Sequence, residues 1–123
     1  MTIKEVSEKC EISKDTLRYY EKMGMIMPIR RNESGFREYS EEDVRWIELA
    51  KCMRSAGLSV EAVAEYVHLY RMGDDTISDR LRLLTEQCDL LVKQREQIDV
   101  TMKRLQVKIA RYKEAEKTGA LQW

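Results

Sequence analysis

The feature that most constrains the fold is a heptad repeat that starts at Ile77 and continues for most of the remaining chain of 123 residues. Apolar residues recur at alternating spacings of three and four, a pattern typical of a coiled coil. At a rise of 1.5 Å per residue such a helix spans roughly 50 Å, which is too long to be buried against the residues before it. We therefore expect it to pair with a second copy of the chain. The predicted seam consists of Ile77, Leu81, Leu84, Cys88, Leu91, Arg95, Ile98, Met102, Leu105, Ile109 and Tyr112.

Arg95 is the charged member of this seam and lies near its middle. An antiparallel two-fold axis would bring the two copies of Arg95 close together. One polar seam residue often fixes the register of a coiled coil at some cost in stability. The pattern ends near Glu116, and it does not place the tail that follows.

The N-terminal part predicts two short helices joined by a tight turn. Thr2 and Glu5 form a capping box, and the first helix reaches about Lys9. A turn at Glu11 and Ile12 follows, with Ser13 as the cap of the second helix. Two short helices joined in this way, the second of them basic, are typical of a helix-turn-helix.

The second helix ends at Gly24, a residue suited to the left-handed conformation just past a helix. Its Leu17 and Tyr20 can face a core. Three cations, Lys14, Arg18 and Lys22, recur four residues apart on another face. Such an edge suits phosphate groups.

Residues 30–39 predict a small hairpin. Asn32 to Gly35 has the composition of a turn, and Phe36 and Tyr39 favour strands. Three arginines, Arg30, Arg31 and Arg37, flank the turn. Directly after a basic helix, this hairpin is interpreted as a wing that reaches the next groove of DNA.

Two further helices are predicted before the heptads. Ser40 caps the first, whose core face we expect to contain Trp46, Leu49, Ala50, Met53 and Ala56. Ser59 caps the second, and Val63, Tyr66, Val67 and Tyr70 form its apolar stripe.

The charges are balanced overall but separated along the chain. Residues 14–37 carry six cations and three anions, residues 40–79 carry four and nine, and residues 80–123 carry ten and six. A basic patch on a neutral chain favours a local site for a polyanion. An enzyme has little support, because there is one histidine, no glycine-rich phosphate loop and no nucleophile with a partner base.

The cysteines Cys10, Cys52 and Cys88 are far apart and lack the spacing of metal ligands. They indicate a reduced, cytoplasmic protein. No signal peptide or membrane span is expected, and neither is a metal or a cofactor.

The order of these elements resembles the MerR family of bacterial transcription regulators. The resemblance rests on three segments, residues 15–21 (DTLRYYE), 24–28 (GMIMP) and 35–39 (GFREY), and extends from Met1 to about Met72. It implies a mainly α fold, with a winged helix-turn-helix DNA-binding domain followed by a long antiparallel coiled-coil dimerisation helix. We expect the domain in residues 1–73, the helix in 74–116 and a C-terminal tail in 117–123.

The resemblance also implies contacts with DNA and a mechanism. A homodimer would bind double-stranded promoter DNA with an over-long spacer and distort it, thereby acting on RNA polymerase indirectly. The residues that match contact positions are Lys14, Thr16, Arg18 and Tyr19 or Tyr20 in the second helix, Arg31, Phe36, Arg37 and Tyr39 in the wing, and Arg54 after it.

The chain has no cysteine-bearing metal loop after the long helix, and it stops at residue 123. It is therefore similar to the short NmlR-like and AdhR-like branch, whose members respond to carbonyl and nitrosative stress. That similarity assigns effector sensing to Cys52, whereas Cys10 and Cys88 lie at packing positions. The alternative is an architectural winged-helix DNA binder without an effector.

Overall fold

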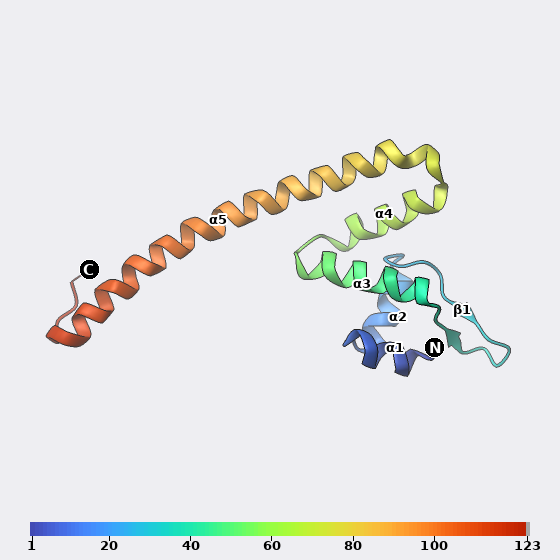
Figure 1. Ribbon diagram of the computed structural model, residues 1–123, viewed down its shortest axis with the longest axis horizontal. Coiled ribbons are helices and arrows are strands. Elements are labelled where there is room, and N and C mark those ends of the chain that lie inside the picture. Colours follow the sequence, from blue (N-terminus) through green and yellow to red (C-terminus); the bar gives the residue numbers. More distant parts are fainter. Residues whose placement is uncertain (123) are drawn as a thin grey trace. The chain divides into compact units, whose positions relative to one another are not determined.

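The computed structural model describes residues 1–122, which form mainly α-helices with one two-stranded sheet (Figure 1). They divide into two compact units, Met1–Gln87 and the part from Cys88 onward. No helix in residues 1–122 is long and apolar enough to cross a membrane. The elements are α1 (Ile3–Cys10), α2 (Lys14–Lys22), β1 (Arg30–Arg31), β2 (Arg37–Glu38), α3 (Glu41–Ser55), α4 (Val60–Met72), a 3-10 turn η1 (Asp74–Thr76) and α5 (Ile77–Thr118).

The first four helices begin at the side-chain caps predicted from the sequence. Thr2 and Glu5 form the expected capping box of α1. The Ser13 hydroxyl accepts a hydrogen bond from the Thr16 N–H at the start of α2, and the Ser59 hydroxyl accepts one from the Ala62 N–H at the start of α4. Ser40 and Asp43 form a second capping box at α3. These caps satisfy backbone groups that a helix start leaves without partners.

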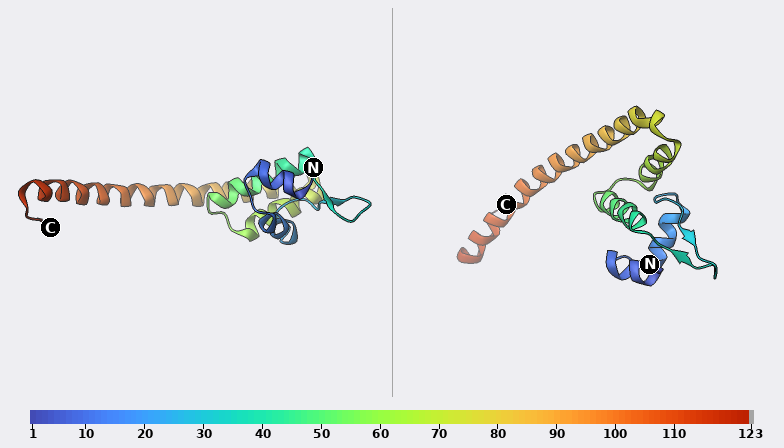
Figure 2. Two further views of the ribbon diagram at one scale, coloured as in Figure 1. Left: turned by 90° about the horizontal axis from the view of Figure 1, so that it is seen from below. Right: turned by 45° about the vertical axis from the view of Figure 1, so that its right-hand side comes forward.

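The turn between α1 and α2 and the exit from α2 both require left-handed backbone. Glu11 has a φ of 53° and lets the chain reverse between the two helices. Gly24 follows α2 with a φ of 76°, a conformation that costs glycine little. The predicted helix-turn-helix is confirmed, and Figure 2 shows α1 and α2 beside the N-terminus.

The predicted hairpin, which was interpreted as a wing, is also confirmed and is antiparallel. Arg30 pairs with Glu38, and Arg31 pairs with Arg37. At the tip, the Asn32 Oδ1 accepts hydrogen bonds from the backbone of Ser34 and Phe36, both at 3.0 Å. This is the turn chemistry expected of asparagine.

The base of the hairpin is joined to the start of the chain. The Met1 amino group donates to the Tyr39 carbonyl at 2.7 Å, and the Tyr39 N–H donates to the Met1 carbonyl at 2.8 Å. Both backbone groups of Tyr39 are therefore paired with Met1, and these bonds fix the end of the hairpin to the start of the chain.

The core of the first unit lies where α1, α2 and α3 meet. Its largest fully buried side chains include Leu17 of α2, Ile47 of α3, and Met25 from the apolar run after α2. Leu17 and Tyr20 are buried as predicted. The basic edge of α2 is consequently turned away from the core.

The core face predicted for α3 was partly wrong. Trp46 and Ala50 are buried, but Leu49 and Ala56 are exposed, whereas Val44 and Ile47 are buried. The reason is that α3 packs against α1 and α2 as well as α4. Its buried surface is therefore wider than one apolar stripe.

Hydrogen bonds of a buried threonine form the joint between α4 and α5. The Thr76 Oγ1 lies 2.6 Å from the Leu69 carbonyl and 2.8 Å from the Gly73 carbonyl, and it accepts from the Arg80 Nε at 3.0 Å. The Arg80 guanidinium also lies 5.4 Å from the Tyr70 ring centroid. The first turns of α5 thus belong to the first unit, Met1–Gln87.

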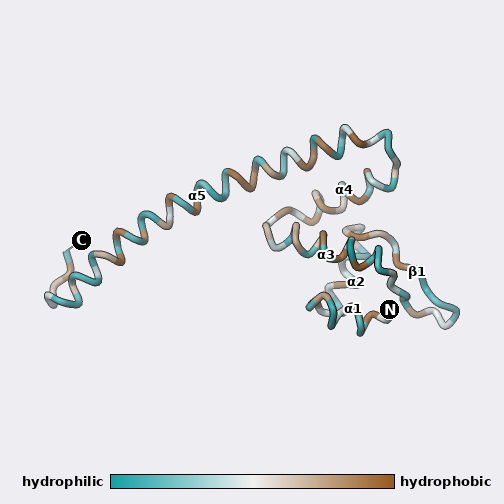
Figure 3. Tube along the Cα trace, in the orientation of Figure 1, coloured by the Kyte–Doolittle hydropathy of each residue, from teal (hydrophilic) through white to brown (hydrophobic). Residues whose placement is uncertain are grey.

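Helix α5 comprises 42 residues, which corresponds to a length of about 63 Å. Figure 3 shows hydrophobic segments recurring along it. From Cys88 to Gln122 the described side chains are exposed or half-buried. A long helix with this much exposed apolar surface has an unpartnered face.

Candidate nucleic-acid interface

The basic edge of α2 is solvent-accessible along its whole length. Lys14, Arg18 and Lys22 are all exposed. Arg18 forms an ion pair with Asp15, 3.0 Å between Nη1 and Oδ1, but such surface pairs contribute little free energy. Arg18 can therefore exchange this carboxylate for a phosphate.

The structure distinguishes the two adjacent tyrosines of α2. Tyr19 is 45% exposed, whereas Tyr20 is 7% exposed. Burial raises the pKa of Tyr20, and the charge of Arg54 opposes that shift. Tyr19 is therefore available to a ligand on the α2 surface, and Tyr20 belongs to the core.

Two further residues of this group lie near α2. Thr16 is half-buried, and its hydroxyl is 2.7 Å from that of the cap residue Ser13. Arg54 lies close to α2 although it is distant in sequence, since its charge acts on the pKa of Tyr20. It donates from Nη1 to the Leu58 carbonyl at 2.6 Å, which fixes the guanidinium beside the loop between α3 and α4.

The tip of the wing presents a cation and an aromatic ring to solvent. Arg31 donates from Nη1 to the Gly35 carbonyl at 2.7 Å, across the turn. Phe36 is 70% exposed and is thus the most exposed large apolar side chain of the wing. An exposed phenylalanine at the tip of a hairpin, flanked by arginines, is an apolar contact for a partner's surface.

The base of the wing is more buried than its tip. Arg37 donates from Nε to the Glu21 Oε1 at 2.6 Å. Tyr39 is buried, and its hydroxyl has no hydrogen-bond partner among residues 1–122. Desolvation raises the pKa of Tyr39, with opposing influence from the charges of Arg37 and Arg18.

The site residues predicted from the sequence therefore fall into two groups by accessibility. Lys14, Arg18, Tyr19, Arg31, Phe36 and Arg54 are exposed, whereas Thr16, Tyr20, Arg37 and Tyr39 are half-buried or buried beneath them. Both groups come from α2, the wing and the end of α3, which share one compact unit.

Glu21 is a functional candidate that the sequence analysis did not single out. Its carboxylate bonds Arg37 and also accepts from the backbone of Ile29 at 3.1 Å. The signal in the sequence was an acid in the last turn of a basic helix, where the helix dipole disfavours negative charge.

The three cysteines differ in accessibility. Cys10 is buried, and its carbonyl accepts a bond from Lys51 of α3. Burial and a hydrogen bond to Glu48 raise the pKa of the Cys10 thiol to about 11, so it stays protonated near neutral pH. Cys52 and Cys88 are exposed. Within residues 1–122, no group of three or more His, Cys, Asp or Glu side chains could hold a metal ion.

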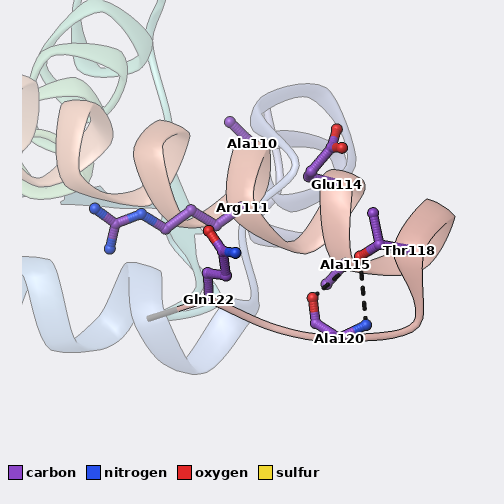
Figure 4. Close-up of a pocket in the computed structure, with 7 residues that line it drawn as sticks. All are labelled: Ala110, Arg111, Glu114, Ala115, Thr118, Ala120 and Gln122. Atoms are coloured by element: carbon purple, nitrogen blue, oxygen red, sulfur yellow. Dashed lines mark hydrogen bonds between the residues drawn. The ribbon is translucent and has the colours of Figure 1, made fainter.

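A surface hollow of about 510 Å³ lies where the chain turns back after α5 (Figure 4). The Gly119 N–H donates to the Ala115 carbonyl at 2.7 Å, and Thr118 and Ala120 exchange weak hydrogen bonds. Among the residues that line it, Ala115 is half-buried and the others are exposed. Without a buried polar group, the hollow indicates no ligand chemistry.

Two family models match the chain. The model described as MerR HTH family regulatory protein matches residues 1–69, and the one described as MerR, DNA binding matches residues 44–107. A relative, the HTH-type transcriptional regulator AdhR of Bacillus subtilis, is 46% identical over 93 residues. That match covers 76% of this chain and 66% of AdhR, just under two thirds of its length.

Two solved structures are similar over almost the whole chain. One is a putative MerR family transcriptional regulator from Listeria monocytogenes, with a TM-score of 0.89 and 45% identity, covering 92% of this chain and 86% of that one. The other is HiNmlR, described as a MerR family regulator lacking the sensor domain, bound to promoter DNA. Its TM-score is 0.88 at 31% identity, with coverage of 97% and 94%.

Proposed function

The chain belongs to the MerR family of helix-turn-helix transcriptional regulators, and we propose that it binds promoter DNA as a homodimer and changes transcription in response to an electrophile. Its relatives are DNA-binding regulators and not enzymes. The observation that carries the proposal is the exposed basic edge of α2 beside an arginine-bearing wing. Such a regulator acts where the chromosome is, in the cytoplasm.

In this proposal α2 enters the major groove, and the wing contacts the adjacent backbone. Lys14, Arg18 and Tyr19 supply donors from α2. Arg31 and Phe36 contact DNA from the wing tip, and Arg54 supplies a backbone contact from the α3–α4 loop. Thr16 and Arg37 are half-buried and keep donors that can reach phosphates, whereas Tyr20 and Tyr39 are buried and support the interface from the core.

Arg18→Ala is expected to weaken operator binding by roughly 1–3 kcal/mol, because it removes a charged contact. It should also lower the dependence of log K on log salt concentration by about one phosphate. The measurement is a binding titration of both proteins at several salt concentrations. Lys113→Ala, an exposed cation of α5, is the control. Full-strength binding by Arg18→Ala would contradict the helix-and-wing interface.

The dimer would form through the seam of α5. Most seam residues of α5 are exposed in the single chain. They are Ile77, Leu81, Leu84, Cys88, Arg95, Ile98, Met102, Leu105, Ile109 and Tyr112, and Leu91 is half-buried. Antiparallel pairing buries them and places one DNA-binding unit at each end. By its family resemblance, the bound dimer distorts the promoter spacer and so acts on RNA polymerase indirectly.

Cys52 is the proposed sensor. It is exposed on α3, and the assignment comes from the resemblance to the AdhR-like branch. The chemistry is addition across a carbonyl: the Cys52 Sγ forms a bond to the aldehyde carbon, and the thiol proton goes to the carbonyl oxygen. Cys10 is a poor alternative because its pKa is raised to about 11 and it is buried.

The sensor is tested by replacing each thiol. Cys52→Ser is expected to abolish the transcriptional response to formaldehyde while leaving operator affinity unchanged. Cys10→Ser and Cys88→Ser should retain the response. Thiol alkylation read by mass spectrometry should show that formaldehyde protects Cys52 from labelling, because the sulfur engaged in the adduct cannot react. A normal response in Cys52→Ser would reject the sensor, and absence of any response in the native protein would favour an architectural DNA binder.

A further inference from the structure

Glu21 connects α2, the proposed recognition helix, to both strands of the wing. Its Oε2 accepts from the Ile29 N–H at 3.1 Å, immediately before β1. Its Oε1 accepts from the Arg37 Nε at 2.6 Å, at the first residue of β2. One carboxylate on α2 thus holds the two strands that form the hairpin, with both its oxygens in use.

A carboxylate is unfavourable at this position for two reasons. Glu21 lies in the last turn of α2, where the helix dipole is negative. In the proposed complex it also lies near the DNA backbone, which repels anions. Both effects would be relieved by a neutral residue, so a compensating role is required.

We propose that Glu21 is a positioning residue for DNA recognition, which fixes the wing relative to α2 and aims the Arg37 guanidinium at the DNA backbone. The proposal rests on the DNA interface described under the proposed function. Glu21 itself does not contact DNA in it.

The geometry of Arg37 explains how this works. Its Nε is taken by Glu21, and the side chains of both residues are 21% exposed. The planar guanidinium is then fixed in orientation, and its terminal nitrogens remain as donors on the other edge. A charge-assisted bond between partly buried groups loses less to solvent than a surface pair does. The arginine is therefore oriented before DNA arrives, and less entropy is lost on binding.

Glu21→Gln separates positioning from plain electrostatics by the sign of its effect. Glutamine can still accept the Ile29 N–H, but its amide group cannot replace the charged bond to Arg37. Removing an anion near DNA should by itself strengthen binding. Positioning predicts the opposite, an affinity roughly tenfold weaker. Asp15→Asn is the matched control, because it removes an exposed acid from the same helix, and it should bind as tightly as the native protein or more tightly.

A double-mutant cycle identifies Arg37 as the group through which Glu21 acts. In an Arg37→Ala background, Glu21→Gln should no longer weaken binding. Glu21→Gln should also lower the salt slope and weaken the hydroxyl-radical footprint under the wing, while the footprint under α2 persists. A loss of folded protein alone would weaken the footprints under the wing and under α2 equally and would leave the salt slope unchanged.

Arg37→Lys keeps the charge but lacks the Nε donor, and it provides a second route if Glu21→Gln folds poorly by circular dichroism. Positioning predicts that Arg37→Lys also binds several-fold more weakly. Native affinity in either folded variant, or additive effects of Glu21→Gln and Arg37→Ala, would overturn the proposal. The DNA interface would still stand in that case, since it depends on the separate loss caused by Arg18→Ala.

Discussion

Ile98→Lys is expected to convert the protein to a monomer and to abolish operator binding. Ile98 is a seam position that is 58% exposed in the single chain, so the substitution leaves the isolated helix intact. Burying an isoleucine contributes about 2–3 kcal/mol per copy, and the lysine charge would add a desolvation cost. With two copies, dimerisation weakens by more than a thousandfold.

Loss of operator binding follows because two recognition helices must reach half-sites about one DNA turn apart. Analytical ultracentrifugation gives the mass, and a binding titration gives the affinity. Val100→Lys is a matched control, two residues away, 46% exposed and outside the heptad positions. It should remain dimeric and bind DNA normally. A dimeric Ile98→Lys protein with native affinity would rule out the seam.

Leu17→Ala is expected to destabilise the DNA-binding unit by about 3 kcal/mol. Leu17 is a fully buried residue of α2, and deletion of a buried leucine loses transfer free energy and leaves a cavity. Denaturant unfolding at one fixed protein concentration measures the effect, because the stability of the proposed dimer would depend on concentration.

Leu17→Met conserves the volume of that side chain and should cost under about 1.5 kcal/mol. The comparison separates a cavity from a general intolerance of substitution at residue 17. Equal stability of the alanine and native proteins would mean that α2 is not held by this core.

Local signals predicted the ends of the helices well. The caps Ser13, Ser40 and Ser59 and the left-handed Gly24 depend on hydrogen bonds and backbone angles within a few residues, so a short stretch of sequence contains the cause. The hairpin tip at Asn32 followed for the same reason.

Features that depend on neighbours distant in sequence were predicted less well. Periodicity gave α3 one apolar stripe, but packing on several sides buried Val44 and Ile47 and left Leu49 exposed. The pair between Glu21 and Arg37 joins residues 16 positions apart, and no local pattern encodes it. The resemblance left Tyr19 and Tyr20 equivalent, and only the fold separated them.

The hydrogen-bonded joint at Thr76 bears on how a signal could leave the DNA-binding unit. Helix α3 contacts α4, and α4 contacts the η1 turn that contains Thr76. The joint consists of a few short polar contacts around one buried hydroxyl, and such contacts are either made or broken, because a half-satisfied buried group is costly. If Cys52 is the sensor proposed above, an adduct on α3 reaches α5 through α4 and this buried joint, and breaking the joint would switch a fraction of the molecules in proportion to the dose.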